Sequence, residues 1–278
     1  MQKIKIITDS TLDIPVDLIK KNDIEVMPLL INFGEDSYLD GVDITPTEMI
    51  ERINRENVLP TTAQITPTRF EETFKKYLDQ GYKIVTLVLS SEMSGTYQSA
   101  CIAKDMLETE DIVVIDSRNV TSGLGILVLK ACRLRDNGAS IHEIEEEILN
   151  TRDKVKCTLN FESLDNLVRG GRLPKVAGAI GTALGLRLIL EIKDGKMAVK
   201  DKVRGSKKAF KKLISDFESA DVDFKEPVIL TDLLNEDVYF ELKKYLEEKD
   251  IEYVDAKVGC TVGIHSGIKP CGLFFIVK

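Results

Sequence analysis

Short apolar runs alternate with helix-like segments through the first half of this chain. Apolar and β-branched side chains predict buried strands at residues 4–8, 84–89 and 112–116. Apolar periodicity predicts helices at residues 68–80, 121–137 and 141–151. Residues 26–33 form a further apolar run that Pro28 interrupts, which predicts an edge or irregular strand. Strands that alternate with helices imply right-handed crossovers and a mainly parallel sheet.

The second half of the chain has a different pattern. The pair Asp194-Gly195 separates the apolar runs 188–193 and 196–202, which predicts a two-residue β-hairpin. Further strands are expected at 156–161, 228–231, 251–258 and 272–277, and helices at 206–219 and 237–249. We therefore expect an α/β fold of two domains, residues 1–160 with a mainly parallel βαβ sheet and residues 161–278 with a mixed or antiparallel sheet. No linker rich in Pro, Ser or Gly separates them, so close docking is expected.

Charge and hydropathy exclude several classes of protein. A chain of 278 residues with a net charge of −8 lacks the basic face that a general nucleic-acid binder needs. No apolar run approaches the ~18 residues that span a bilayer, so no integral membrane segment is expected. The first eight residues are strand-like rather than typical of a signal peptide. A cytoplasmic location is the resulting expectation.

Metal and nucleotide cofactors have little support in the sequence. Its 5 cysteines contain no CxxC pair, and 2 histidines are too few for a multi-histidine site. The phosphate-binding loop GxxxxGK[ST], a strand-linked GxGxxG, HExxH and GxSxG are all absent. We therefore expect no cofactor.

A turn rich in hydroxyls follows the strand at 84–89. Ser94 and Thr96 flank Gly95 where the next helix is expected to begin. A helix N-terminus at the carboxyl end of a parallel strand favours an anion, and glycine lets a ligand approach the backbone. Ser94 is equally consistent with a simple helix cap.

One histidine near the C-terminus, His265, lies among glycines. It is consistent with a structural histidine or with a ligand contact. Ser94, His265 and Asp9 also suggest a Ser-His-Asp esterase or acyltransferase with Ser94 as nucleophile, although such triads are recognised by geometry. A third possibility is a sugar- or phosphate-binding module that uses the hydroxyl-rich turns.

Five short motifs together resemble the DegV family across nearly the full length of the chain. In order, they are Asp9-Ser10-Thr11, Pro60-Thr61-Thr62-Ala63-Gln64, Ser94-Gly95-Thr96-Tyr97, Arg169-Gly170-Gly171-Arg172 and Gly263-x-His265-x-Gly267. The resemblance implies a two-domain α/β protein that binds a long-chain fatty acid, such as palmitate, in a tunnel between its domains. It implies a carrier rather than an enzyme. Some members of the family present the fatty acid to a separate ATP-dependent kinase subunit, which makes an acyl phosphate.

The resemblance also assigns the carboxylate site. It implies that Thr62 and Ser94 hold the carboxylate, beside Gly95 and His265, with Thr61 as the rival of Thr62. The Gly- and Ala-rich segment 176–190 could wall the tunnel or belong to an ordinary core.

The chain departs from the family pattern at two places. The family usually has Thr-Gly-Pro-Gly after the histidine, whereas Ser266-Gly267-Ile268-Lys269-Pro270 follows His265 here. Arg187-Leu188 replaces the usual Lys-Pro. Both departures bear on the length of the acyl chain that the protein prefers and on its partnering with a kinase.

Three arginines lie beside glycines in an otherwise acidic chain: Arg169, Arg172 and Arg204. Such turns are normally exposed, and the guanidinium group suits phosphate and carboxylate recognition. By resemblance to the kinase-partnered members, we expect these arginines to dock an acidic patch of a kinase subunit near the tunnel mouth. The alternative is solvated surface charge.

Overall fold

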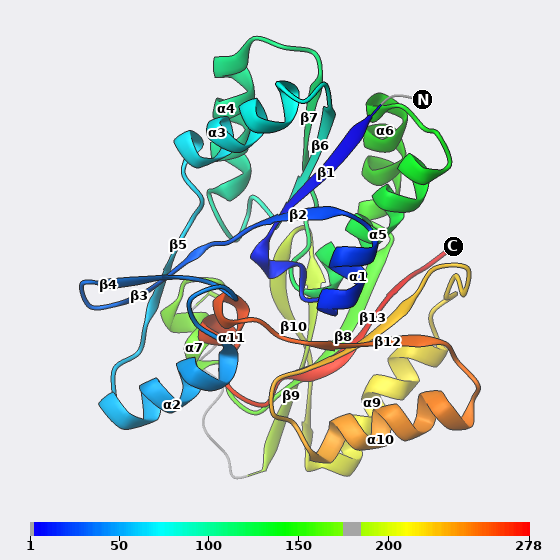
Figure 1. Ribbon diagram of the computed structural model, residues 1–278. Helices are drawn as coiled ribbons and strands as arrows, with labels where there is room; N and C mark the ends of the chain where they lie inside the picture. Colours follow the sequence, from blue (N-terminus) through cyan, green and yellow to red (C-terminus); the bar gives the residue numbers. More distant parts are fainter. Residues whose placement is uncertain (1–2, 175–184) are drawn as a thin grey trace.

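The computed structural model describes residues 3–174 and 185–278 (Figure 1). Most of the segment expected to wall a tunnel, 176–190, therefore lies outside the described residues. None of the helices within the described ranges has the length and hydropathy to cross a membrane.

The first sheet is parallel throughout, as the alternating pattern predicted. Its strand order is β2-β1-β6-β7, with bounds Ile24–Met27, Ile4–Asp9, Lys83–Val88 and Ile112–Asp116. Successive side chains of a strand point to opposite faces, so Ile7 packs with α3 (Pro67–Leu78) and α4 (Thr96–Leu107). Ile6 packs with α5 (Ser122–Asp136) and α6 (Ile141–Arg152) on the other face. Figure 1 shows these two helical layers on either side of the sheet.

The second sheet is mixed, as expected. Its order is β10-β9-β8-β13-β11-β12, with bounds Lys196–Arg204, Leu186–Lys193, Val155–Phe161, Cys271–Ile276, Val228–Asp232 and Tyr253–Lys257. Only β11 and β12 are parallel; the other neighbours are antiparallel. The predicted hairpin joins β9 and β10, and Asp194 and Gly195 both have the positive φ that its turn requires. Helices α9 (Ser206–Glu218) and α10 (Asp237–Glu248) cover one face.

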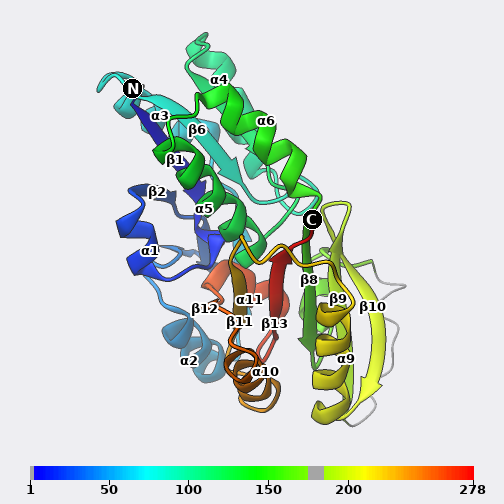
Figure 2. The same cartoon turned by 90° about the vertical axis from the view of Figure 1, so that its right-hand side faces the viewer.

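One apolar core joins the two sheets. Leu124 and Leu127 of α5 belong to the same buried cluster as Ile6 of the first sheet and Phe274 of the second. Figure 2 shows α5 reaching from the first sheet toward the second. The change of sheet falls between α6 and β8, so the predicted domain boundary at residue 160 lies inside β8.

A small third sheet lies beside the junction. Its order is β4-β3-β5, with bounds Asp36–Leu39, Leu30–Phe33 and Thr61–Ala63. The expectation of a single strand over residues 26–33 is therefore wrong, because the run divides at Pro28 into β2 and β3 of different sheets. Proline has no N–H to donate to a ladder, which explains why pairing stops there. The other helices of the described residues are α1 (Val16–Lys21), α2 (Pro46–Glu56), α7 (Asp165–Arg169) and α11 (Cys260–Ser266), with a 3₁₀ turn η1 at Ser10–Leu12.

Candidate functional site

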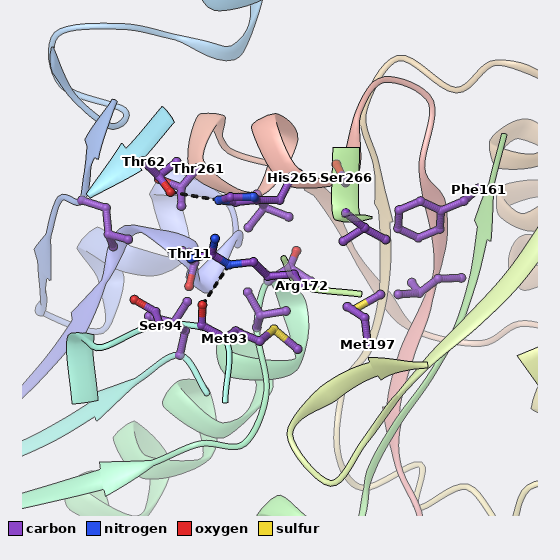
Figure 3. A pocket seen from close by; sticks show the side chains of 17 residues that line it. Thr11, Thr62, Met93, Ser94, Phe161, Arg172, Met197, Thr261, His265 and Ser266 are labelled. Atoms are coloured by element: carbon purple, nitrogen blue, oxygen red, sulfur yellow. Dashed lines mark hydrogen bonds between the residues drawn. The ribbon is translucent and has the colours of Figure 1, made fainter. Parts of the chain in front are cut away.

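A cavity lies between the two sheets, near the carboxyl ends of β1 and β6. Seventeen side chains of the described residues line it (Figure 3). Its apolar wall consists of Leu29, Leu89, Met93, Val120, Leu159, Phe161, Leu167, Met197 and Val262. Its polar side chains are Thr11, Thr62, Ser94, Thr121, Arg172, Thr261, His265 and Ser266. In Figure 3, Thr62 and Ser94 lie at one side and Phe161 and Met197 at the opposite side. An elongated ligand with one polar end fits this division.

Thr62 and His265 come together in the polar part of the cavity. Thr62 Oγ1 lies 2.9 Å from His265 Nε2, although the two residues are 203 positions apart in the sequence. Thr62 is in β5 and His265 in the last turn of α11. Side chains alternate along a strand, so Thr61 points elsewhere and is exposed. The structure thus brings Thr62, and not Thr61, to the cavity.

Ser94 lies in the turn between β6 and α4, where the hydroxyl-rich stretch was expected. Its Oγ is 3.0 Å from Thr96 Oγ1 and accepts a hydrogen bond from the Thr96 N–H at 3.3 Å. Ser94 therefore satisfies one free N–H of the helix start and also lines the cavity. The two roles that the sequence left open are both compatible with its position.

Gly95 adjoins the Thr62 loop rather than open space. A Cβ atom at Gly95 would lie 2.0 Å from Gln64 Oε1. Gln64 in turn donates from Nε2 to Ser99 Oγ at 3.0 Å. The glycine lets the Gln64 carboxamide lie against α4, which ties together the two loops that carry Thr62 and Ser94.

His265 is neutral at physiological pH. Burial, with the nearby charges of Arg172 and Arg169, lowers the pKa of its imidazole to about 4. Its Nδ1 faces Gly170, where a Cβ atom would lie only 2.4 Å away. A neutral ring can donate from Nε2 to Thr62 Oγ1, which leaves the Thr62 hydroxyl proton free for a ligand.

We expect His265 to remain neutral as the pH falls from 6.5 to about 4. The pKa of His265 is lower in the folded protein than in the unfolded chain. The stability that results from this difference is fully present above pH 6.5 and is lost as the pH falls to about 4. Imidazole resonances in a ¹H–¹³C NMR titration would measure this directly. His142, the other histidine, is exposed on α6 and gives a second resonance as an internal reference. A His265 midpoint near 6.5 would contradict the prediction.

Arg172 was expected in an exposed turn, and this expectation is wrong. The Arg172 N–H donates to the Leu167 carbonyl at 2.9 Å, so the chain folds back onto the end of α7. The side chain is half-buried and lines the cavity, where Nε donates to the Met93 carbonyl at 3.0 Å. Its guanidinium forms no ion pair with any carboxylate of the described residues. Arg169 and Arg204 are exposed as expected, so the structure separates Arg172 from them.

The Ser-His-Asp arrangement is not assembled. Within the described ranges, Thr62 is the side chain that hydrogen-bonds the His265 ring. Asp9 is completely buried and accepts from the Thr11 hydroxyl and from the N–H groups of Thr11 and Leu89. Burial raises the pKa of Asp9 to about 6. Asp9 therefore organises the loop after β6 rather than orienting His265.

Thr261 is a cavity residue that the sequence did not indicate. It lies in the first turn of α11, is buried, and its Oγ1 has no hydrogen-bond partner among the described residues. A buried hydroxyl of this kind suits a polar ligand atom. In residues 3–174 and 185–278, no group of three or more His, Cys, Asp or Glu side chains is placed to hold a metal ion.

Comparison with known sequences places the chain among related bacterial proteins. Residues 3–278 match the model of the family described as "Uncharacterised protein, DegV family". A DegV domain-containing protein of Clostridium perfringens is 56% identical over 276 residues, which cover 99% of each chain. One from Clostridium acetobutylicum is 55% identical over 278 residues, with 100% of both chains covered.

Solved structures resemble the whole fold. A DegV family protein from Thermus thermophilus, described by its fatty acid binding, has a TM-score of 0.88 at 28% identity, with both chains fully covered. DegV of Bacillus subtilis, described as a fatty acid binding protein, has a TM-score of 0.87 at 26% identity and full coverage of both chains. A stearic acid-binding protein from Eubacterium ventriosum has a TM-score of 0.84 at 26% identity, over 100% of this chain and 99% of that one.

Proposed function

Because this chain belongs to the DegV family, we propose that it binds a long-chain fatty acid, such as palmitate, in the cavity between its sheets. The observation that carries the proposal is the cationic Arg172, the one charged side chain among the described lining residues, which has no carboxylate partner among the described residues. Similar proteins described as fatty-acid binders support it. We propose a carrier rather than a catalyst.

The polar side chains can satisfy a carboxylate that leaves water. A buried carboxylate needs hydrogen bonds, and those from a charged donor are the strongest. The hydroxyls of Thr62 and Ser94 and the guanidinium of Arg172 supply donors from three separate segments. In the tautomer with its proton on Nε2, neutral His265 donates to Thr62 and leaves the Thr62 hydroxyl proton for the ligand.

The apolar wall suits the acyl chain. Burying about 15 methylenes of the acyl chain at ~0.8 kcal/mol each contributes about 12 kcal/mol of favourable binding free energy. Association costs about 4–15 kcal/mol, so net affinity depends on the carboxylate contacts as well. Met93 and Met197 line the cavity, and methionine adapts to chains of different shape.

Mass spectrometry of a denaturing organic extract of the purified protein tests the proposal. We expect a saturated or monounsaturated fatty acid, and a higher melting temperature when palmitate is added to delipidated protein. Repeated extracts without lipid, together with an unchanged melting temperature, would show that the cavity has another ligand.

Thr62→Ala and Ser94→Ala are each expected to weaken palmitate binding by roughly 1–3 kcal/mol, the cost of leaving a buried polar group unpaired. Titration calorimetry would measure the loss, and both variants should still fold. Thr61→Ala is the matched control for Thr62→Ala, because the exposed Thr61 side chain is the adjacent hydroxyl of the same strand. Ester hydrolysis by the wild type that Ser94→Ala abolishes would instead favour the esterase.

We also propose that the protein presents its fatty acid to an ATP-dependent kinase subunit, with Arg169 and Arg204 on the docking face. Both side chains are exposed, and Arg169 is close enough to lower the pKa of His265. Arg169→Glu with Arg204→Glu should slow acyl-phosphate formation in a reconstituted assay and leave palmitate affinity unchanged, since rim charges act mainly on association. Normal turnover by this double variant would exclude the docking role.

A further inference from the structure

The helix that carries His265 is held at its start by carboxylates from the other half of the chain. Asp13 Oδ1 accepts the Gly259 N–H at 2.9 Å, across 246 positions of sequence. Asp40 accepts the Cys260 N–H on Oδ1 at 3.2 Å and the Thr261 N–H on Oδ2 at 3.3 Å. The first N–H groups of a helix have no partner within the helix. Asp13 and Asp40, here called the aspartate clamp, supply those partners for α11.

The aspartate clamp is buried and its geometry is fixed. Asp13 and Asp40 are only 6% and 4% exposed. Asp13 Oδ2 accepts from the Thr121 hydroxyl at 2.6 Å, and Asp40 Oδ2 accepts from the Ser10 hydroxyl at 2.9 Å. Asp13 and Thr121 both have positive φ, at 33° and 52°. Such backbone conformations persist only where surrounding contacts impose them.

The Thr62–His265 hydrogen bond joins β5 to α11, so its length depends on where α11 is held. Thr62 belongs to β5, whereas His265 belongs to α11, and α11 is also bound by α7 through Asn166 Nδ2 and the Ile264 carbonyl at 2.9 Å. Cys260 and Ile264 of α11 pack against apolar residues near α2 as well. Apolar packing is not directional, whereas hydrogen bonds to three successive N–H groups fix the rotation and height of a helix.

We propose that Asp40, together with Asp13, is a positioning residue of the carboxylate site: the aspartate clamp sets the place of α11 and thereby the distance between His265 and Thr62. The carboxylates suit the positive end of the helix, which offsets part of their burial cost. The inference rests on the proposed function for its ligand, although the position of His265 can be measured without one.

Asp40→Ala removes both acceptors of the α11 N–H groups and is the main variant. In the ligand-free protein we expect the His265 imidazole resonance to move and its titration midpoint to rise toward the ordinary value. Palmitate affinity should fall roughly tenfold, about 1.4 kcal/mol. Asp40→Asn retains one acceptor oxygen and should be intermediate in both measurements.

Ser140→Ala is the matched control. Ser140 accepts the Glu143 N–H at 3.3 Å and caps α6, a helix that contributes none of the described lining residues of the cavity. It should lower stability without changing the His265 titration or palmitate affinity.

Each outcome decides the proposal. An unchanged His265 titration in Asp40→Ala overturns it, whether or not affinity falls, because lost affinity alone would be a general structural effect. If Asp40→Ala does not fold, Asp40→Asn carries the test, and a displaced His265 titration supports the clamp whereas an unaltered one overturns it. If the wild type binds no palmitate, the proposed function fails, but the ligand-free titration still decides the clamp.

Discussion

Replacing Arg172 with glutamate is expected to abolish measurable palmitate binding. The variant removes the one cation that lines the described cavity and places a negative charge near the ligand carboxylate. Loss of a buried charge partner costs roughly 3–5 kcal/mol, which is more than a hundredfold in Kd. Titration calorimetry with delipidated protein would measure this loss, and melting of the ligand-free variant would verify that it folds.

Arg169→Glu is the matched control for Arg172→Glu. It makes the same change of net charge in the same turn, on a side chain that is exposed rather than directed into the cavity. Its palmitate affinity should equal that of the wild type. Arg172→Lys keeps the charge but loses the planar guanidinium, and an intermediate affinity is expected. Wild-type affinity in Arg172→Glu would show that the carboxylate does not bind at this end of the cavity.

Gly272→Ala is expected to destabilise the fold by more than about 3 kcal/mol. Gly272 lies in β13, between β8 and β11, and a Cβ atom there would be 2.1 Å from the backbone oxygen of Thr158. A backbone atom inside a sheet cannot move aside as a flexible side chain can. Urea unfolding monitored by circular dichroism would measure the change.

Gly138→Ala provides the comparison for Gly272→Ala. Gly138 has φ of +90°, yet open space surrounds its missing Cβ. Only the cost of the backbone conformation applies, on the order of 1 kcal/mol. Equal losses in the two variants would mean that β13 moves away from β8 to accept the methyl group.

The alternation of strands and helices predicted the parallel sheet because the apolar pattern that marks each strand is local in the sequence. Buried strands need continuous apolar runs, and Asp194-Gly195 fixes its own turn. The division at Pro28 was not predicted, because the same apolar run can continue one strand or supply two sheets. Tertiary pairing with β1 and with β4 decided that outcome.

The site was predicted only in part, for a similar reason. The resemblance indicated Thr62, Ser94 and His265, and all three line the cavity. Arg172 was misjudged because a glycine-flanked arginine is typical of an exposed turn, whereas the carbonyl that holds it belongs to Met93, 79 positions away. No local pattern marks Thr261, which lines the cavity from the first turn of α11.

The close contact between Gly95 and Gln64 couples what these two positions can accept. A methyl group at position 95 overlaps the Gln64 carboxamide, the far end of a flexible side chain, so a side chain at 95 requires that carboxamide to shift or to be shortened. The cost of a side chain at position 95 should therefore depend on the residue at position 64, and substitutions at the two positions should be non-additive.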